Sequence, residues 1–127
     1  MSSMRTWIIS SVLAVTSALP LHAFEQPSLQ LFATCAGRLS AEMEFAWLMH
    51  SERADVVEQQ RADVLDLLAA VMEAGQERQA LATRIAAKQA HAALLTRATF
   101  NEDDEDAAWA ASLAQRQHAN CLAFLLS

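Results

Sequence analysis

The chain has 127 residues, of which 54% are apolar and 19% are charged, and its formal net charge is −6. This length fits one small domain, and this apolar fraction excludes a disordered chain. Alanine, the best helix former, occurs 27 times, whereas the helix breakers glycine and proline occur twice each. Because few β-branched and aromatic residues are available for strands, the composition predicts an all-α protein. The negative charge disfavours nucleic acid and anionic lipid as partners.

Residues 1–23 have the pattern of a secretory signal peptide. Arg5 is the only charge among the first 24 residues, and an apolar stretch from Trp7 to Leu19 is followed by the small residue Ala23. We expect cleavage after Ala23, which leaves one helical domain over residues 24–127 in the periplasm or outside the cell. An uncleaved membrane anchor is the alternative, because the uncharged run is borderline in length for crossing a bilayer.

Both cysteines, Cys35 and Cys121, lie in the expected mature chain. An even number of cysteines in a small exported domain indicates a disulfide, and only one intramolecular pairing exists. Neither cysteine has a second cysteine at the spacing of zinc ligands, so they do not indicate a metal site. The alternative is two buried free thiols. We expect a disulfide that joins the beginning of the domain to its end.

Two helices are expected between Pro27 and Gly75, with a break in the polar segment 51–55. One long helix through this segment is the alternative. The apolar stripe of the first helix consists of Phe32, Cys35, Ala36, Leu39, Met43, Ala46, Trp47 and His50. That of the second consists of Val57, Val64, Leu68, Val71 and Met72. Small residues around Gly37 favour the close approach of another helix, and Gly75 is a suitable C-cap.

Two further helices complete the expected fold. The third runs over residues 76–100, and its apolar stripe is formed by Leu81, Ile85, Ala92 and Leu95. The fourth opens at Asn101 as the N-cap, with acidic residues 102–106 in its first turns. We therefore predict a small antiparallel bundle of four helices. In an up-down-up-down bundle the first and last helices are neighbours, which places Cys35 and Cys121 at facing levels.

Motifs for catalysis and for metals are not found in the sequence. No glutamate is followed by a histidine three residues later, as a dimetal bundle requires, and Cys-x-x-Cys-His is missing. The acidic run lacks the glycine and glutamate of an EF-hand, and no Gly-x-Ser-x-Gly turn occurs. Non-covalent haem needs facing ligands, but Met43 and His118 are expected at different levels. We expect no metal, no cofactor and no enzymatic activity.

Arg84, Lys88 and His91 share one edge of the third expected helix. Three basic residues at helical spacing are conspicuous in an acidic chain. Our hypothesis is that they form a contact surface for an acidic partner or a small anion. The alternative is internal pairing with carboxylates such as Glu42 or Asp66.

These observations favour a non-catalytic interaction or accessory protein of the cell envelope, with another envelope protein as its partner. The alternative is a carrier that holds a small ligand, or haem, in the interior of the bundle. A carrier is expected to contain a bound small molecule after purification, whereas an interaction protein is expected to be empty.

Overall fold

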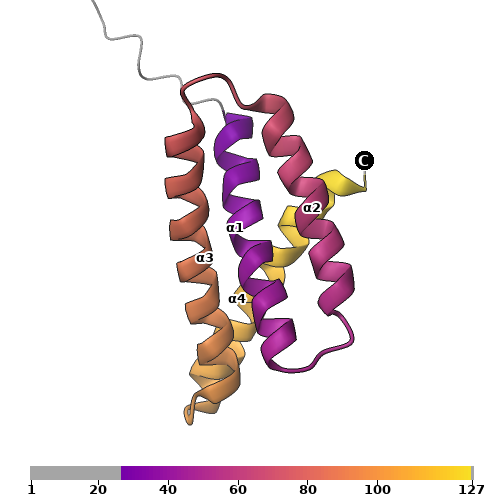
Figure 1. The fold of residues 1–127 in the computed structure, drawn as a ribbon. Helices are drawn as coiled ribbons and strands as arrows, with labels where there is room; N and C mark the ends of the chain where they lie inside the picture. The colour runs from indigo at the N-terminus through magenta and orange to yellow at the C-terminus, as the bar shows by residue number, and fades with distance from the viewer. Residues whose placement is uncertain (1–26, 127) are drawn as a thin grey trace, which may run out of the picture.

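The computed structural model describes residues 27–126 (Figure 1). Its helices are α1 (Pro27–Leu48), α2 (Ala54–Val71), α3 (Glu77–Phe100) and α4 (Asp104–Leu122), followed by the 3-10 turn η2 (Ala123–Leu125). The described residues contain no strand, so the predicted four-helix, all-α bundle is confirmed. None of the described helices combines the length and apolar character needed to cross a membrane. The expected signal peptide, residues 1–23, lies outside the described residues.

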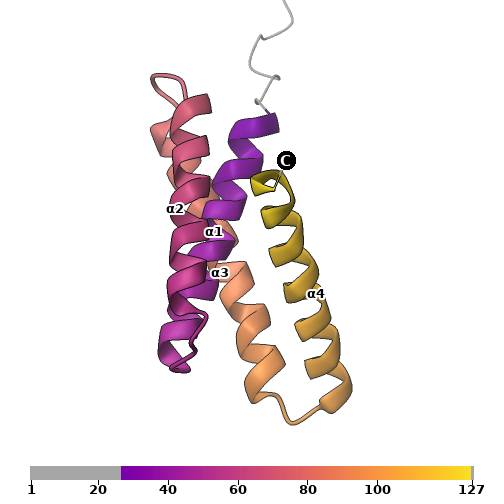
Figure 2. The same cartoon turned by 90° about the vertical axis from the view of Figure 1, so that its right-hand side faces the viewer.

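The chain runs up-down-up-down, and α1 lies in the middle of the molecule. Helices α2 and α3 pack along α1 on either side, and α4 crosses behind it (Figure 1). A quarter turn of the view shows α2 and α4 on opposite sides of α1 (Figure 2). Helix α1 therefore contributes to all three groups of buried apolar side chains, which contain Leu39, Ala41 and Leu29 respectively.

The predicted break between the first two helices is confirmed. Helix α1 ends at Leu48, and His50 adopts a left-handed backbone conformation with φ 51°. The Ser51 N–H donates to the Ala46 carbonyl over 2.8 Å, which together with the bond from His50 N to Trp47 O completes a Schellman motif. His50 therefore takes the position where glycine is commonest, and the chain turns there into α2.

Two predicted helix boundaries are corrected. Helix α2 ends at Val71, and Gly75 lies beyond it in the following turn with φ 91°. The N-cap of α4 is Asp103 rather than Asn101, because the Asp103 carboxylate accepts hydrogen bonds from the N–H groups of Glu105 and Asp106. Asn101 instead accepts a hydrogen bond from the Asp103 N–H over 3.0 Å. A carboxylate at this cap also suits the positive end of the helix dipole.

Helices α1 and α3 approach each other closely at Gly37, as the small residues there predicted. A Cβ atom added to Gly37 would overlap the Arg84 carbonyl oxygen and lie 3.0 Å from the Ala87 Cβ. The backbone of α3 therefore rests against the backbone of α1. Only small side chains fit between the two helices at this level.

This close approach corrects the predicted apolar stripe of α3. Leu81 is 52% exposed and Ile85 is 48% exposed, although both were expected in the core. Leu95 of the predicted stripe is buried as expected, and the other buried residues of α3 are Ala80, His91 and Leu94. On α1, Trp47 and His50 are likewise exposed, because they lie where the helix ends and turns away. Small size, rather than hydrophobicity, decides which side chains of α3 lie against α1.

The disulfide between Cys35 and Cys121 is confirmed. It joins α1 to α4 with a Cα–Cα distance of 5.4 Å, and both cysteines are buried. Close by, the Phe124 ring of η2 meets the Phe32 ring edge-on at a centroid distance of 5.2 Å. The end of the described chain is therefore fixed to the first half of α1. Disulfides of this kind are typical of proteins in an oxidising compartment.

We predict that Gly37→Ala lowers the free energy of unfolding by about 1–2 kcal/mol. Alanine is the better helix former by about 1 kcal/mol, but overpacking against α3 costs about 1–3 kcal/mol. Urea denaturation followed by circular dichroism measures the difference. A variant more stable than the wild type would show that the helices separate at Gly37 at little cost.

We also predict that replacing both cysteines by serine lowers the free energy of unfolding by about 2–4 kcal/mol. The bond closes a loop with a sequence separation of 86 residues, for which the chain-entropy model gives about 4–5 kcal/mol as an upper value. Urea denaturation without reductant measures the effect. Titration of the unfolded wild type with a thiol reagent is the control, and two reactive thiols there would contradict the disulfide.

Candidate functional site

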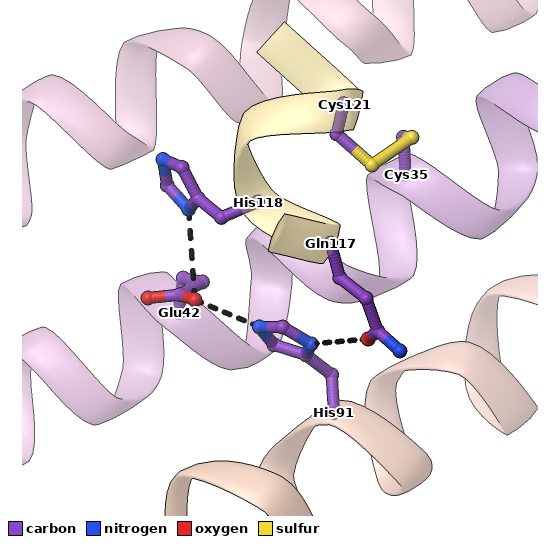
Figure 3. The surroundings of a disulfide bond; sticks show 6 residues. All are labelled: Cys35, Glu42, His91, Gln117, His118 and Cys121. Carbon is purple, nitrogen blue, oxygen red and sulfur yellow. Dashed lines mark hydrogen bonds and ion pairs between the residues drawn. A yellow bond between two sulfur atoms is a disulfide. The ribbon is translucent and has the colours of Figure 1, made fainter. Parts of the chain in front are cut away.

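A buried polar cluster connects three helices next to the disulfide (Figure 3). It contains Glu42 from α1, His91 from α3, and Gln117 and His118 from α4. His91 Nε2 lies 2.7 Å from Glu42 Oε1, and His118 Nδ1 lies 3.5 Å from the same oxygen. The longer distance allows electrostatic attraction but exceeds that of a good hydrogen bond. Glu42 is thus the group on which the cluster converges.

His91 is held on both ring nitrogens. Its Nδ1 lies 3.0 Å from Gln117 Oε1, opposite the contact between Nε2 and Glu42. The nitrogen that faces Glu42 donates to the carboxylate. The second contact is a hydrogen bond when the ring carries both protons or when Gln117 presents its amide nitrogen. Because the His91 side chain has no exposed surface, these two partners account for all of its polar contacts.

Glu42 is ionised at neutral pH despite its burial. Burial by itself raises the pKa of Glu42, but the interactions with His118 and His91 outweigh burial and lower the pKa from 4.5 to about 2. Only 15% of the side chain is exposed. A carboxylate with this pKa stabilises the fold as long as it keeps its charge.

The structure separates the three residues of the predicted basic edge. His91 is buried in the cluster, which corrects the expectation that it shares an exposed surface with Lys88. Lys88 forms an ion pair with Glu44, and Nε of Arg84 is buried without a hydrogen-bond partner in the described residues. The expected internal pairing therefore exists for Lys88 and His91. A contact of Arg84 and Lys88 with an outside partner stays a prediction.

A cavity of about 620 Å³ opens beside the cluster, between α1, the turn after it, α2, α3 and α4. Its volume lies within the range of pockets that hold small molecules. Its apolar wall consists of Phe45, Ala46, Met49, Val57, Leu95, Ala98, Ala111, Ala114, Ala119 and Leu122. Its polar wall consists of Glu42, Ser51, Arg53, Gln60, Gln115 and His118. Alanine dominates the α4 side of the cavity, and the short side chains leave the space open.

Polar atoms without a partner lie in the wall of this cavity. Gln60 Oε1 and His118 Nδ1 are buried, and neither has a hydrogen-bond partner in the described part of the chain. The contacts of Glu42 with His91 and His118 both use Oε1, and the other carboxylate oxygen points away from His91 (Figure 3). Native structures pair their buried polar groups with protein or with bound molecules. The cavity therefore has unused hydrogen-bonding capacity on an otherwise mostly apolar surface.

The residues of this site are present in the sequence, but the sequence does not show that the fold brings them together. Glu42 was considered as a carboxylate partner for the basic edge, and the structure shows that its partner there is His91. His118 precedes Cys121 by three residues on the expected fourth helix, and this spacing was the available signal for a place near the disulfide. Gln60 and Gln117 carried no signal of their own. No group of histidine, cysteine and carboxylate side chains among residues 27–126 is arranged to hold a metal ion.

In comparisons with known proteins, no family model, curated protein or solved structure matches this chain. The function therefore has to follow from the chemistry of the cavity and its walls.

We predict that the protein becomes less stable in acid because Glu42 is protonated there. Glu42→Gln is expected to remove this part of the pH dependence. The folded-state pKa of about 2 lies below the ordinary value of 4.5, so the stabilisation is complete above about pH 4.5 and is lost as the pH falls towards 2. Between pH 6 and pH 3 the wild type is expected to lose about 2 kcal/mol more than Glu42→Gln.

Urea denaturation at each pH measures this difference. The matched control is Glu44→Gln, which removes a solvent-exposed pair with Lys88 worth about 0–1 kcal/mol. Parallel pH profiles for the wild type and Glu42→Gln would contradict the assignment of the acid sensitivity to Glu42.

Proposed function

We propose that this protein is a non-catalytic carrier that binds a small, largely apolar molecule in the cavity between α1, α2, α3 and α4. The observation that carries the proposal is the cavity itself. It has an alanine-rich wall and two buried polar atoms, Gln60 Oε1 and His118 Nδ1, that lack hydrogen-bond partners among the described residues. An apolar space with a few convergent polar groups is the usual form of a small-molecule site.

The proposed place of action is the periplasm or the outside of the cell. The disulfide between Cys35 and Cys121 supports an oxidising compartment. The pattern of residues 1–23 supports export with cleavage after Ala23. The scarcity of glycine supports binding rather than catalysis, because tight loops that build oxyanion or phosphate sites need glycine.

A second candidate function is contact with another envelope protein through one end of the bundle. The end of α1 lies at the same end of the bundle as the α3–α4 connection (Figure 1). Exposed apolar residues near the ends of α1 and α3 and the start of α4 are Trp47, Leu48, Met49, Phe100 and Trp109, and we call these residues the apolar end. The Trp109 ring is covered by the Arg97 guanidinium at 5.1 Å. Clusters of exposed aromatic and aliphatic side chains are typical of interaction sites. Affinity capture with a Trp47→Ser, Phe100→Ser variant as the control tests this candidate.

We predict that the purified protein binds the neutral fluorescent probe N-phenyl-1-naphthylamine and that Ala111→Leu weakens this binding at least about tenfold. The larger side chain fills the α4 wall of the cavity. The matched control is Ala93→Leu, which makes the same change at an exposed position of α3 away from the cavity. Probe fluorescence measures binding, and thermal unfolding shows that both variants are folded.

Equal binding by the two variants would place the probe outside the cavity and overturn the proposal. A second measurement is independent of the probe. Protein purified from its native envelope is denatured, and the released small molecules are identified by mass spectrometry. The carrier proposal expects a molecule that is missing from the Ala111→Leu preparation.

A further inference from the structure

We propose that the ligand of the cavity is an amphiphilic primary amine: an ammonium group on an apolar alkyl or aryl body. The proposal rests on the proposed carrier function and adds the chemical class of the ligand. It follows from which hydrogen-bonding atoms of the wall are occupied and which are not.

Two residues of the cavity wall, Gln60 and Glu42, offer acceptor oxygens to a ligand. Gln60 Oε1 is buried without a partner in the described residues, and a carbonyl oxygen only accepts hydrogen bonds. The Glu42 carboxylate lines the same cavity, and its Oε2 is not the oxygen that His91 and His118 approach. A ligand that satisfies these atoms must carry N–H or O–H groups. An ammonium group has three donors and no acceptor, and its bonds to a carboxylate are charge-assisted.

The charges around the cavity select against an anionic head group. A carboxylate or phosphate has only acceptor oxygens when ionised, and it would bring a second negative charge to the Glu42 carboxylate. The basic residues that line the cavity are Arg53, which is exposed, and His118. His91 is fully buried and does not line it. Both imidazoles already point at Glu42 (Figure 3). The net charge of the chain, −6, further favours a cationic ligand.

The rest of the cavity matches an apolar body. Phe45, Met49, Leu95 and Leu122 line it together with several alanines, so a hydrocarbon chain replaces water along most of its surface. Phe45 lies three residues after Glu42 on α1, and both residues line the cavity.

Four probes with the same eight-carbon chain test the proposal: 1-octylamine, 1-octanol, octanoate and octyltrimethylammonium. Binding to the purified, disulfide-bonded protein is measured by isothermal titration calorimetry at pH 8. We expect 1-octylamine to bind about tenfold or more tightly than 1-octanol, and octanoate to bind most weakly. Octyltrimethylammonium has the charge without N–H donors, so we expect it to bind less tightly than 1-octylamine.

Two variants locate the head group. Glu42→Gln removes the charge, and Gln60→Leu removes the unpaired carbonyl oxygen at nearly constant size. Each is expected to reduce the affinity for 1-octylamine about tenfold while the affinity for 1-octanol changes less than threefold. Because Glu42 also connects three helices, Gln60→Leu keeps the test valid if Glu42→Gln is poorly folded.

The outcomes separate the two proposals. Equal affinity for the amine, the alcohol and octanoate would overturn the amine assignment and leave the carrier function intact, with water satisfying Gln60. Amine binding that neither variant changes would also overturn the assignment. Failure of all four probes and of the naphthylamine probe to bind would overturn the carrier function as well.

Discussion

The backbone contact between α1 and α3 at Gly37 is the constraint on which the rest of the structure depends. Because a Cβ atom at Gly37 would overlap the Arg84 carbonyl oxygen, the two helices lie at a distance that admits only small side chains. Leu81 and Ile85 are therefore left on the outside of α3. The same geometry brings His91 close enough to α1 to reach Glu42. Tight packing of one helix pair thus determines which polar groups are buried.

Helix α4 is held by covalent and polar contacts more than by large apolar side chains. The disulfide fixes its end at Cys121, and one turn earlier His118 and Gln117 reach Glu42 and His91. At its beginning, Asp106 is bonded to Arg97 of α3. The side of α4 that faces α2 carries small residues such as Ala111 and Ala119. These attachments hold the helix in place without filling the space beside it, which is why the bundle contains a cavity.

The sequence was sufficient for the fold and insufficient for the site, for a physical reason. Helix positions follow from local signals, such as the polar segment after His50 and the scarcity of glycine, and the pairing of Cys35 with Cys121 follows from their number. The face that α3 turns towards α1 depends on how closely the two backbones approach. The predicted stripe accordingly missed His91, whose polarity suggested the surface. The unpaired Gln60 oxygen and the cavity exist only once all the helices are in place.

The positions of the tryptophans determine what optical methods report on this molecule. Trp47 and Trp109, the two tryptophans in the described part of the chain, are 48% and 51% exposed in the folded state. The sequence contains no tyrosine. The rings of Trp47 and Trp109 are already in contact with water in the folded state. Unfolding therefore changes the wavelength of their emission little. The Arg97 guanidinium over Trp109 makes that ring a reporter of the α3–α4 connection. The fluorescence of Trp47 and Trp109 therefore follows events at the apolar end, while helix content is the better measure of the core.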